Sequence, residues 1–152
     1  MLRVNLKMQH AAALSERPCP GRSTTPLARF APFVLSLVRI VAALLFFEHG
    51  LSKLFGFPPH GAMAHFPQLE FFAGVVEFVG GGLVTLGLFT RQAAFLMSGE
   101  MAIGYFMVHA PKSFFPLLNG GEGAILYSFL FFFLAFAGPG PWSLDAMLRG
   151  KA

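Results

Sequence analysis

The chain has 152 residues, of which 55% are hydrophobic and only 12% are charged. A soluble domain of this size needs more charge to cover its surface, so the composition excludes a soluble protein and predicts a small, one-domain integral membrane protein. The formal net charge is +4, but the basic residues lie beside apolar segments and form no patch interleaved with aromatic residues. We therefore expect the lipid bilayer as a partner and no nucleic acid.

Residues 1–29 are polar and carry five Lys or Arg among Ser, Thr and Pro. No continuous apolar stretch begins before residue 30, which argues against a cleaved secretory signal. The single cysteine, Cys19, lies here and cannot form an internal disulfide. We expect a disordered basic cytoplasmic tail over 1–29 and a membrane domain over 30–152.

Four hydrophobic stretches follow, and each approaches the roughly 20 residues that a helix needs to cross a bilayer. They occupy residues 32–55, 69–89, 92–109 and 121–137. The segments 56–68 and 111–120 contain the Pro and Gly of loops. Thr90 and Arg91 leave so little chain between the second and third stretches that these must form an antiparallel hairpin. The predicted fold is an all-α integral membrane protein, a four-transmembrane-helix antiparallel bundle.

The distribution of Lys and Arg predicts the orientation, because cytoplasmic loops carry an excess of positive charge. The tail, the hairpin with Arg91, and the C-terminal end with Arg149 and Lys151 hold most of the basic residues. The opposite side has only Lys53 and Lys112, and Lys53 is expected to extend toward lipid headgroups. Both termini are therefore expected in the cytoplasm.

The residues after the fourth stretch predict a change of structure. Residues 138–141 read Gly-Pro-Gly-Pro and cannot continue a helix. Trp142 suits the membrane interface, where amphipathic rings settle. Ser143 is expected to cap a short surface helix, with Asp145 favoured in its first turn by the helix dipole.

Small residues predict where the helices approach each other closely. They are Gly74, Gly80, Gly81 and Gly82 in the second stretch, and Ala94, Ser98 and Ala102 at four-residue spacing in the third.

Four glutamates lie within or at the rims of the apolar stretches: Glu48, Glu77, Glu100 and Glu122. A carboxylate in hydrocarbon costs several kcal/mol, so each must face protein, water or a partner, and each is by default a functional-site hypothesis. With about 1.5 Å of rise per residue, the first three reach a similar depth, roughly 10–15 Å below the outer surface. They predict a polar cleft that opens outward.

Three more residues join this candidate site. His49 neighbours Glu48, and His109 lies with Glu122 at the outer rim. Arg39 lies on the inner side, where it either extends to the interface or reaches Glu100. The ligand-site or proton-site candidates are Glu48, His49, Glu77, Glu100, Arg39, His109 and Glu122. The alternative is architectural: the carboxylates lock helices together, His49 caps a helical turn, and Glu122 complements a helix dipole. No residue is assigned a catalytic role.

Metal and cofactor signatures are not found in the sequence. A di-iron bundle needs Glu-x-x-His pairs on two helices, and no glutamate here is followed three positions later by His. The chain also lacks flavin, haem, iron–sulfur and dithiol signatures. No metal and no resident cofactor are expected.

Three segments resemble the DoxX family of small bacterial membrane proteins: residues 39–57, 76–109 and 114–145. The specific features are an early Arg, His-Gly followed by Lys, a Glu before a glycine cluster, a Thr-Arg hairpin, Asn-Gly-Gly-Glu, and Gly-Pro-Gly with Ser-Leu-Asp. Residues 1–30 depart from the pattern. The resemblance implies a four-helix, multi-pass protein of the bacterial inner membrane, associated in some members with quinone or thiosulfate oxidation and with oxidative-stress complexes.

Two classes of function follow. In the first, the chain is an accessory or quinone-linked subunit of a membrane redox or oxidative-stress system, in which the carboxylates and His49 bind a quinone headgroup and move protons. Because no electron carrier is found, the chain is then at most an oxidoreductase subunit that acts with partner subunits. The alternative is a non-enzymatic membrane scaffold or small lipophilic-ligand binder. Whether the chain is an enzyme, and whether it forms a homo-oligomer, stays open.

Overall fold

The computed structural model describes residues 26–59, 63–66 and 68–150. Residues 1–25 of the expected tail lie outside this range. The chain divides into two compact units, with the boundary between Ala31 and Pro32. In the first, the described residues form the 3-10 turn η1 (Ala28–Phe30), where the guanidinium of Arg29 lies over the ring of Phe30. The second unit contains the residues considered below.

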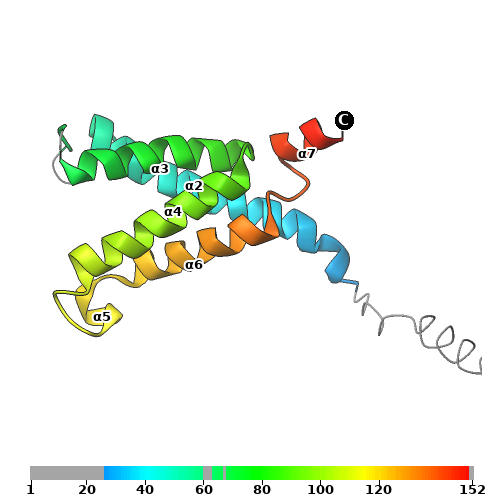
Figure 1. Cartoon of the computed structure of the whole chain (residues 1–152). Coiled ribbons are helices and arrows are strands. Elements are labelled where there is room, and N and C mark those ends of the chain that lie inside the picture. Colours follow the sequence, from blue (N-terminus) through cyan, green and yellow to red (C-terminus); the bar gives the residue numbers. More distant parts are fainter. Residues whose placement is uncertain (1–25, 60–62, 67, 151–152) are drawn as a thin grey trace, which may run out of the picture. The chain divides into compact units, whose positions relative to one another are not determined.

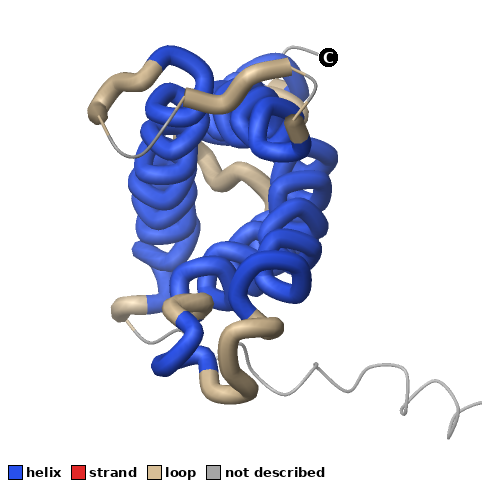
Figure 2. Tube along the Cα trace, turned by 90° about the vertical axis from the view of Figure 1, so that its left-hand side faces the viewer, coloured by secondary structure: helices blue, strands red, loops and turns tan. Residues whose placement is uncertain are grey.

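All regular elements among the described residues are helices, and no strand occurs there (Figure 2). The long helices in Figure 1 are α2 (Ala31–Phe55), α3 (Leu69–Leu86), α4 (Thr90–Gly104), which η2 (Tyr105–His109) continues as a π turn, and α6 (Glu122–Ala137). Two short helices are α5 (Pro116–Asn119) and α7 (Leu144–Arg149). The all-α prediction is confirmed. Of these helices, α2 together with η1, and α3, are long and apolar enough to cross a membrane, and α6 is a shorter apolar helix.

The turn between α3 and α4 lies at residues 87–89, so the prediction that Thr90 and Arg91 form it is wrong. Gly87 adopts a left-handed conformation with φ of 72°, which glycine tolerates best. The N–H groups of Gly87 and Leu88 donate to the carbonyls of Val84 and Leu83, which closes the helix end in the usual glycine-terminated manner. Thr90 and Arg91 are therefore in the first turn of α4.

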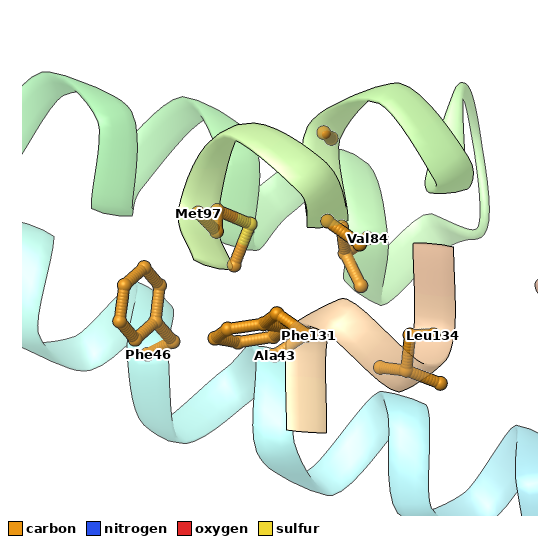
Figure 3. Packing of buried hydrophobic residues seen from close by; sticks show 8 residues of the cluster. Ala43, Phe46, Val84, Met97, Phe131 and Leu134 are labelled. Carbon is orange, nitrogen blue, oxygen red and sulfur yellow. The ribbon is translucent and has the colours of Figure 1, made fainter. Parts of the chain in front are cut away.

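The core draws residues from all four long helices (Figure 3). Its fully buried members are Ala43, Phe46, Val84, Ala94, Met97, Phe131 and Leu134. Phe46 of α2 meets Phe131 of α6 edge to face, with ring centroids 4.8 Å apart. Of the phenylalanines around Phe131 in α6, Phe132 and Phe133 are exposed. Phe131 is therefore part of the core, whereas Phe132 and Phe133 lie on the outer surface of the bundle.

Glycines allow α2 and α3 to approach each other closely, as predicted for Gly74 and Gly81. A Cβ atom on Gly81 would lie 2.9 Å from the backbone of Phe47, and one on Gly74 would lie 3.1 Å from the side chain of Lys53. Gly82, in contrast, has only ordinary contact distances. At Gly81 the neighbour is backbone, so a larger residue requires α2 or α3 to move, whereas at Gly74 the neighbouring side chains would have to shift by a few tenths of an ångström. The crossing therefore brings Lys53 directly against α3.

Arg39 of α2 is fully buried, and within the described residues it donates only to backbone carbonyls. Its Nε donates to Pro139 O at 2.8 Å and its Nη1 to Thr85 O at 2.8 Å. Nη1 also donates to Val84 O, and Nη2 to Trp142 O. Val84 and Thr85 are in the last turn of α3, where carbonyls lack the partner that a continuing helix would supply, although Val84 O also accepts from the N–H of Gly87. One guanidinium therefore joins α2 to the end of α3 and to the segment after α6.

The C-terminal segment closes the same end of the bundle. Ser143 caps α7 as predicted, because its Oγ accepts a hydrogen bond from the N–H of Ala146 at 3.1 Å. The Asp145 carboxylate accepts the N–H groups of Phe89 and Thr90, each at 3.0 Å, and so caps α4 from outside. Burial raises the pKa of Asp145, but these backbone hydrogen bonds, together with the Thr90 side chain and the charge of Arg149, outweigh it, and the pKa lies below its usual value.

The Arg39 bonds give a stability prediction. We expect Arg39→Lys to destabilise the detergent-purified protein by about 2–4 kcal/mol, because a lysine cannot reach carbonyls on both sides and each buried carbonyl left unpaired costs about 1–3 kcal/mol. The measurement is denaturant or thermal unfolding.

The matched control is Arg91→Lys. Arg91 also donates to two carbonyls, those of Ala135 and Phe136, but from an exposed position where other donors replace it. We expect a change of about 0.5 kcal/mol or less for this variant. Equal losses in the two variants would show that burial of the Arg39 bonds is not what stabilises the inner end.

Candidate functional site

An ion pair joins α2 and α3. Lys53 Nζ lies 2.7 Å from Glu77 Oε1, and this is the one salt bridge within the described part of the chain. The Glu77 side chain is 1% exposed and that of Lys53 is 35% exposed. The prediction that Lys53 extends to lipid headgroups is therefore wrong, because its ammonium group turns inward to the buried carboxylate.

Two carboxylates keep an oxygen without a partner. Oε2 of Glu77 and Oε2 of Glu100 are both buried and form no hydrogen bond within the described residues. The charges of Glu77 and Lys53 both act on Glu100, so the three groups form one electrostatic cluster across α2, α3 and α4. A buried polar atom without a partner is costly, and in a native protein it calls for a ligand, a proton or water.

A groove of about 590 Å³ runs beside this cluster, between α3 and the continuous helix α4–η2. Its polar lining residues are Lys53, Glu70, Glu100 and His109. Its apolar lining includes Phe72, Leu96, Ile103 and Met107, each about half exposed or more. A mostly apolar groove of this size with a few polar groups is typical of a small-molecule site. Its exposed apolar rim lies on the outside of the bundle.

The π turn η2 forms part of this wall. Its residues Met107, Val108 and His109 line the groove. The ring of His109 stacks on that of Tyr105, and its Nδ1 lies 3.0 Å from Asn119 O. Because a carbonyl only accepts, Nδ1 carries the proton and Nε2 is left as an acceptor in the neutral ring. Single π turns inside α-helices occur frequently at functional sites.

The structure therefore brings together three of the seven candidates: Glu77, Glu100 and His109. It also adds Lys53 and Glu70, which the sequence reasoning missed. Glu70 precedes Glu77 by seven residues, which is two helical turns, so a signal for the shared face was present. Lys53 could have been chosen because it and Lys112 are the only cations predicted on the side of the carboxylates, so it was a natural partner for one of them.

The other four candidates lie elsewhere. Glu48 and His49 are exposed on α2 and do not line the groove, although the charge of His49 acts on Glu77. Nδ1 of His49 lies 2.9 Å from Leu45 O, one turn earlier, in agreement with the capping alternative. Glu122 is exposed in the first turn of α6, where it complements the helix dipole. Arg39 binds carbonyls and not Glu100, so the expectation that these two meet is wrong.

Within the described ranges, no three His, Cys, Asp or Glu side chains are arranged to hold a metal ion. The available chemistry is that of hydrogen bonding and proton transfer by carboxyl, ammonium and imidazole groups in a partly apolar groove.

Comparison with known proteins assigns the chain to one family. The DoxX family model matches residues 34–110, which include Arg39, Lys53, Glu77 and Glu100. An uncharacterised protein of Haemophilus influenzae is 46% identical over 127 residues, covering 78% of this chain and 93% of that protein. An uncharacterised membrane protein of Mycobacterium tuberculosis is 32% identical over 133 residues, covering 76% and 81%. No solved structure matches.

The ion pair can be tested with a double-mutant cycle. Lys53→Met leaves the buried Glu77 carboxylate uncompensated, so it should destabilise the protein more in the wild-type background than in Glu77→Gln. Because Lys53 is partly exposed, we expect a coupling energy of about 1 kcal/mol, measured by unfolding in detergent.

The control is Lys112→Met, which removes an exposed lysine from the loop before α5. Its effect should add to that of Glu77→Gln without coupling. If Lys53→Met and Glu77→Gln are also additive, the contact contributes nothing to stability.

Proposed function

Because the chain belongs to the DoxX family of membrane proteins, we propose that it crosses the bacterial inner membrane four times as an antiparallel bundle with both termini in the cytoplasm. Besides α2 and α3, α4 with η2 provides a helical path from Thr90 to His109, and α6 is a shorter apolar helix that begins with Glu122. Arg91 and Arg149 lie at the end of the bundle that α7 closes, which favours that end as the cytoplasmic one.

Labelling of single cysteines tests this topology. In a Cys19→Ser background, Lys112→Cys should react with a membrane-impermeant maleimide in intact spheroplasts, and Arg149→Cys should react only after permeabilisation. Both side chains are exposed, so protection reports the membrane rather than burial. Labelling of Arg149→Cys in intact spheroplasts would contradict cytoplasmic termini.

We propose further that the groove binds a quinone-like lipid and that the chain acts as a quinone-linked or accessory subunit of a membrane redox system. The observation that carries this proposal is Glu100, whose buried Oε2 lacks a partner at a groove with apolar walls. A protonated carboxyl of Glu100 and the ammonium group of Lys53 are donors that suit the two carbonyls of a quinone ring. The exposed apolar rim suits an isoprenoid tail that enters from the bilayer.

The direction of entry supports a lipophilic ligand over a water-soluble one. Phe72, Leu96 and Ile103 at the rim are 49%, 59% and 59% exposed, and in a spanning bundle such side chains face hydrocarbon. A polar solute would have to cross that hydrocarbon, whereas a quinone already resides there. A bound quinone would supply the electron chemistry, and electrons would reach it from partner subunits. The residues of this chain bind and orient the headgroup and exchange protons with it.

The second candidate is a scaffold without enzymatic activity, in which the polar groups only specify helix packing. The Lys53–Glu77 ion pair favours it, because that contact joins two helices directly. The two readings differ at Glu100, which contributes no hydrogen bond through Oε2 to the described fold. A scaffold has no use for that oxygen, whereas a ligand site does.

Ligand binding separates the two candidates. We expect a short-chain quinone analogue to raise the melting temperature of the purified protein, and Glu100→Gln to weaken apparent binding about tenfold, equivalent to about 1.4 kcal/mol. Glu122→Gln, an exposed glutamate outside the groove, is the matched control and should bind like wild type. Extraction of the purified protein should also release endogenous quinone. If wild type shows no shift at concentrations that saturate a known quinone protein, the scaffold is the better account.

A further inference from the structure

The outward side of α2 carries a stripe of exposed residues with alternating spacings of four and three. Its members are Val34, Val38, Val41, Leu45 and Glu48. This spacing averages 3.5 residues and is the seam along which two helices pack in a coiled coil. Gly50 marks a different side of α2, because it packs against Phe78 of α3. The four apolar members of the stripe are 39–54% exposed, so the described part of the bundle covers this side of α2 only in part.

Glu48 is the one ionisable residue of this stripe, and its carboxyl group is unfavourable in contact with lipid. It precedes the end of α2 at Phe55 by seven residues, which places it about 10 Å below that end. A glutamate side chain is too short to reach the interface from there, and a carboxylate in hydrocarbon is expensive. Among the described residues, Glu48 takes part in no ion pair and no hydrogen bond. The four apolar members fit either lipid or a helix, whereas Glu48 calls for a polar partner.

His49 provides a complementary group at the same height. Its side chain is exposed, although the ring also meets that of Tyr127 of α6 edge to face, with centroids 6.3 Å apart. Nδ1 donates to Leu45 O at 2.9 Å, since the carbonyl only accepts. In the neutral ring, Nε2 is then an acceptor without a proton. A protonated carboxyl donates to such a nitrogen, and transfer of the proton yields an ion pair instead. In both forms one shared proton satisfies the two groups.

We propose that α2 packs on α2 of a second copy as a parallel two-fold pair, in which Glu48 of each copy binds His49 of the other. Copies inserted in one membrane have the same orientation, so the two-fold axis is parallel to the membrane normal and residues of equal height meet. Glu48 and His49 differ in height by about 1.5 Å. Each copy therefore presents the same patch, and two contacts form: Glu48 of one copy binds His49 of the other, and the reverse. The proposal does not involve the ligand groove.

The test measures self-association of the full chain in liposomes. The single native cysteine, Cys19, takes either a donor or an acceptor fluorophore, and energy transfer is followed as the protein-to-lipid ratio rises. Glu48→Leu and His49→Leu should each raise the ratio at half-dimerisation about tenfold, because each variant removes both reciprocal contacts. The double variant Glu48→His with His49→Glu should restore dimerisation, since every copy carries the exchanged pair. Glu122→Leu is the control and should behave like wild type.

A second measurement locates the interface independently of affinity. In a Cys19→Ser background, Glu48→Cys should form an interchain disulfide on mild oxidation in membranes, and Glu122→Cys should not. A wild type that stays monomeric at all ratios overturns the proposal, and so does a dimer that both leucine variants leave unchanged. Loss of the dimer in the leucine variants without recovery in the exchanged variant also overturns it, because the two residues then bind something other than each other.

Discussion

The structure depends on how one buried guanidinium is satisfied. Among the described residues, no carboxylate forms a hydrogen bond with Arg39. Its guanidinium instead donates to backbone carbonyls of α3 and of the segment after α6. Carbonyls at a helix C-terminus are unpaired within the helix and carry its partial negative charge, so they suit a cation. The cost of burying the charge is thus offset by groups that themselves needed donors.

The surrounding sequence follows from this arrangement. Gly87 has φ of 72°, and a Cβ there would collide with Ser143 and crowd Arg39. Gly140 has φ of 75°, and a Cβ there would collide with Ser36 of α2. The glycines let backbone pass close enough for its carbonyls to reach the guanidinium. Among the described residues, the hydroxyls of Thr85 and Thr90 keep an unpartnered buried oxygen at this closed end, whereas at the opposite end the unpartnered oxygens belong to the carboxyl groups of Glu77 and Glu100. Functional sites are expected where buried charged groups lack hydrogen-bond partners in the fold.

The sequence predicted what depends on local chemistry and periodicity: the helical stretches, the Ser143 cap and the close approach at Gly74 and Gly81. From the rise per residue it also predicted a similar depth for three carboxylates, and this stays a prediction. It did not determine which side of each helix faces the bundle, and so Glu48 was wrongly grouped with Glu77. The partners of Arg39 were not predictable in this way, since backbone carbonyls have no sequence signature. The Lys53–Glu77 contact could not be predicted either, because it depends on where α2 and α3 cross, and the crossing is set by the packing of the helices.

The separation of Arg39 from its partners along the chain has a consequence for synthesis. Two of its acceptors lie 100 and 103 residues later, and the carboxylate that caps α4 lies 55 residues after Thr90. A ribosome completes α2 long before it makes Pro139 and Trp142, so these bonds cannot exist while the first helices enter the bilayer. The nascent chain must carry an uncompensated cation through insertion, held by water, headgroups or the insertion machinery. Pro139 and Trp142 bind Arg39 once they emerge, so synthesis of the segment after α6 is coupled to closure of the fold.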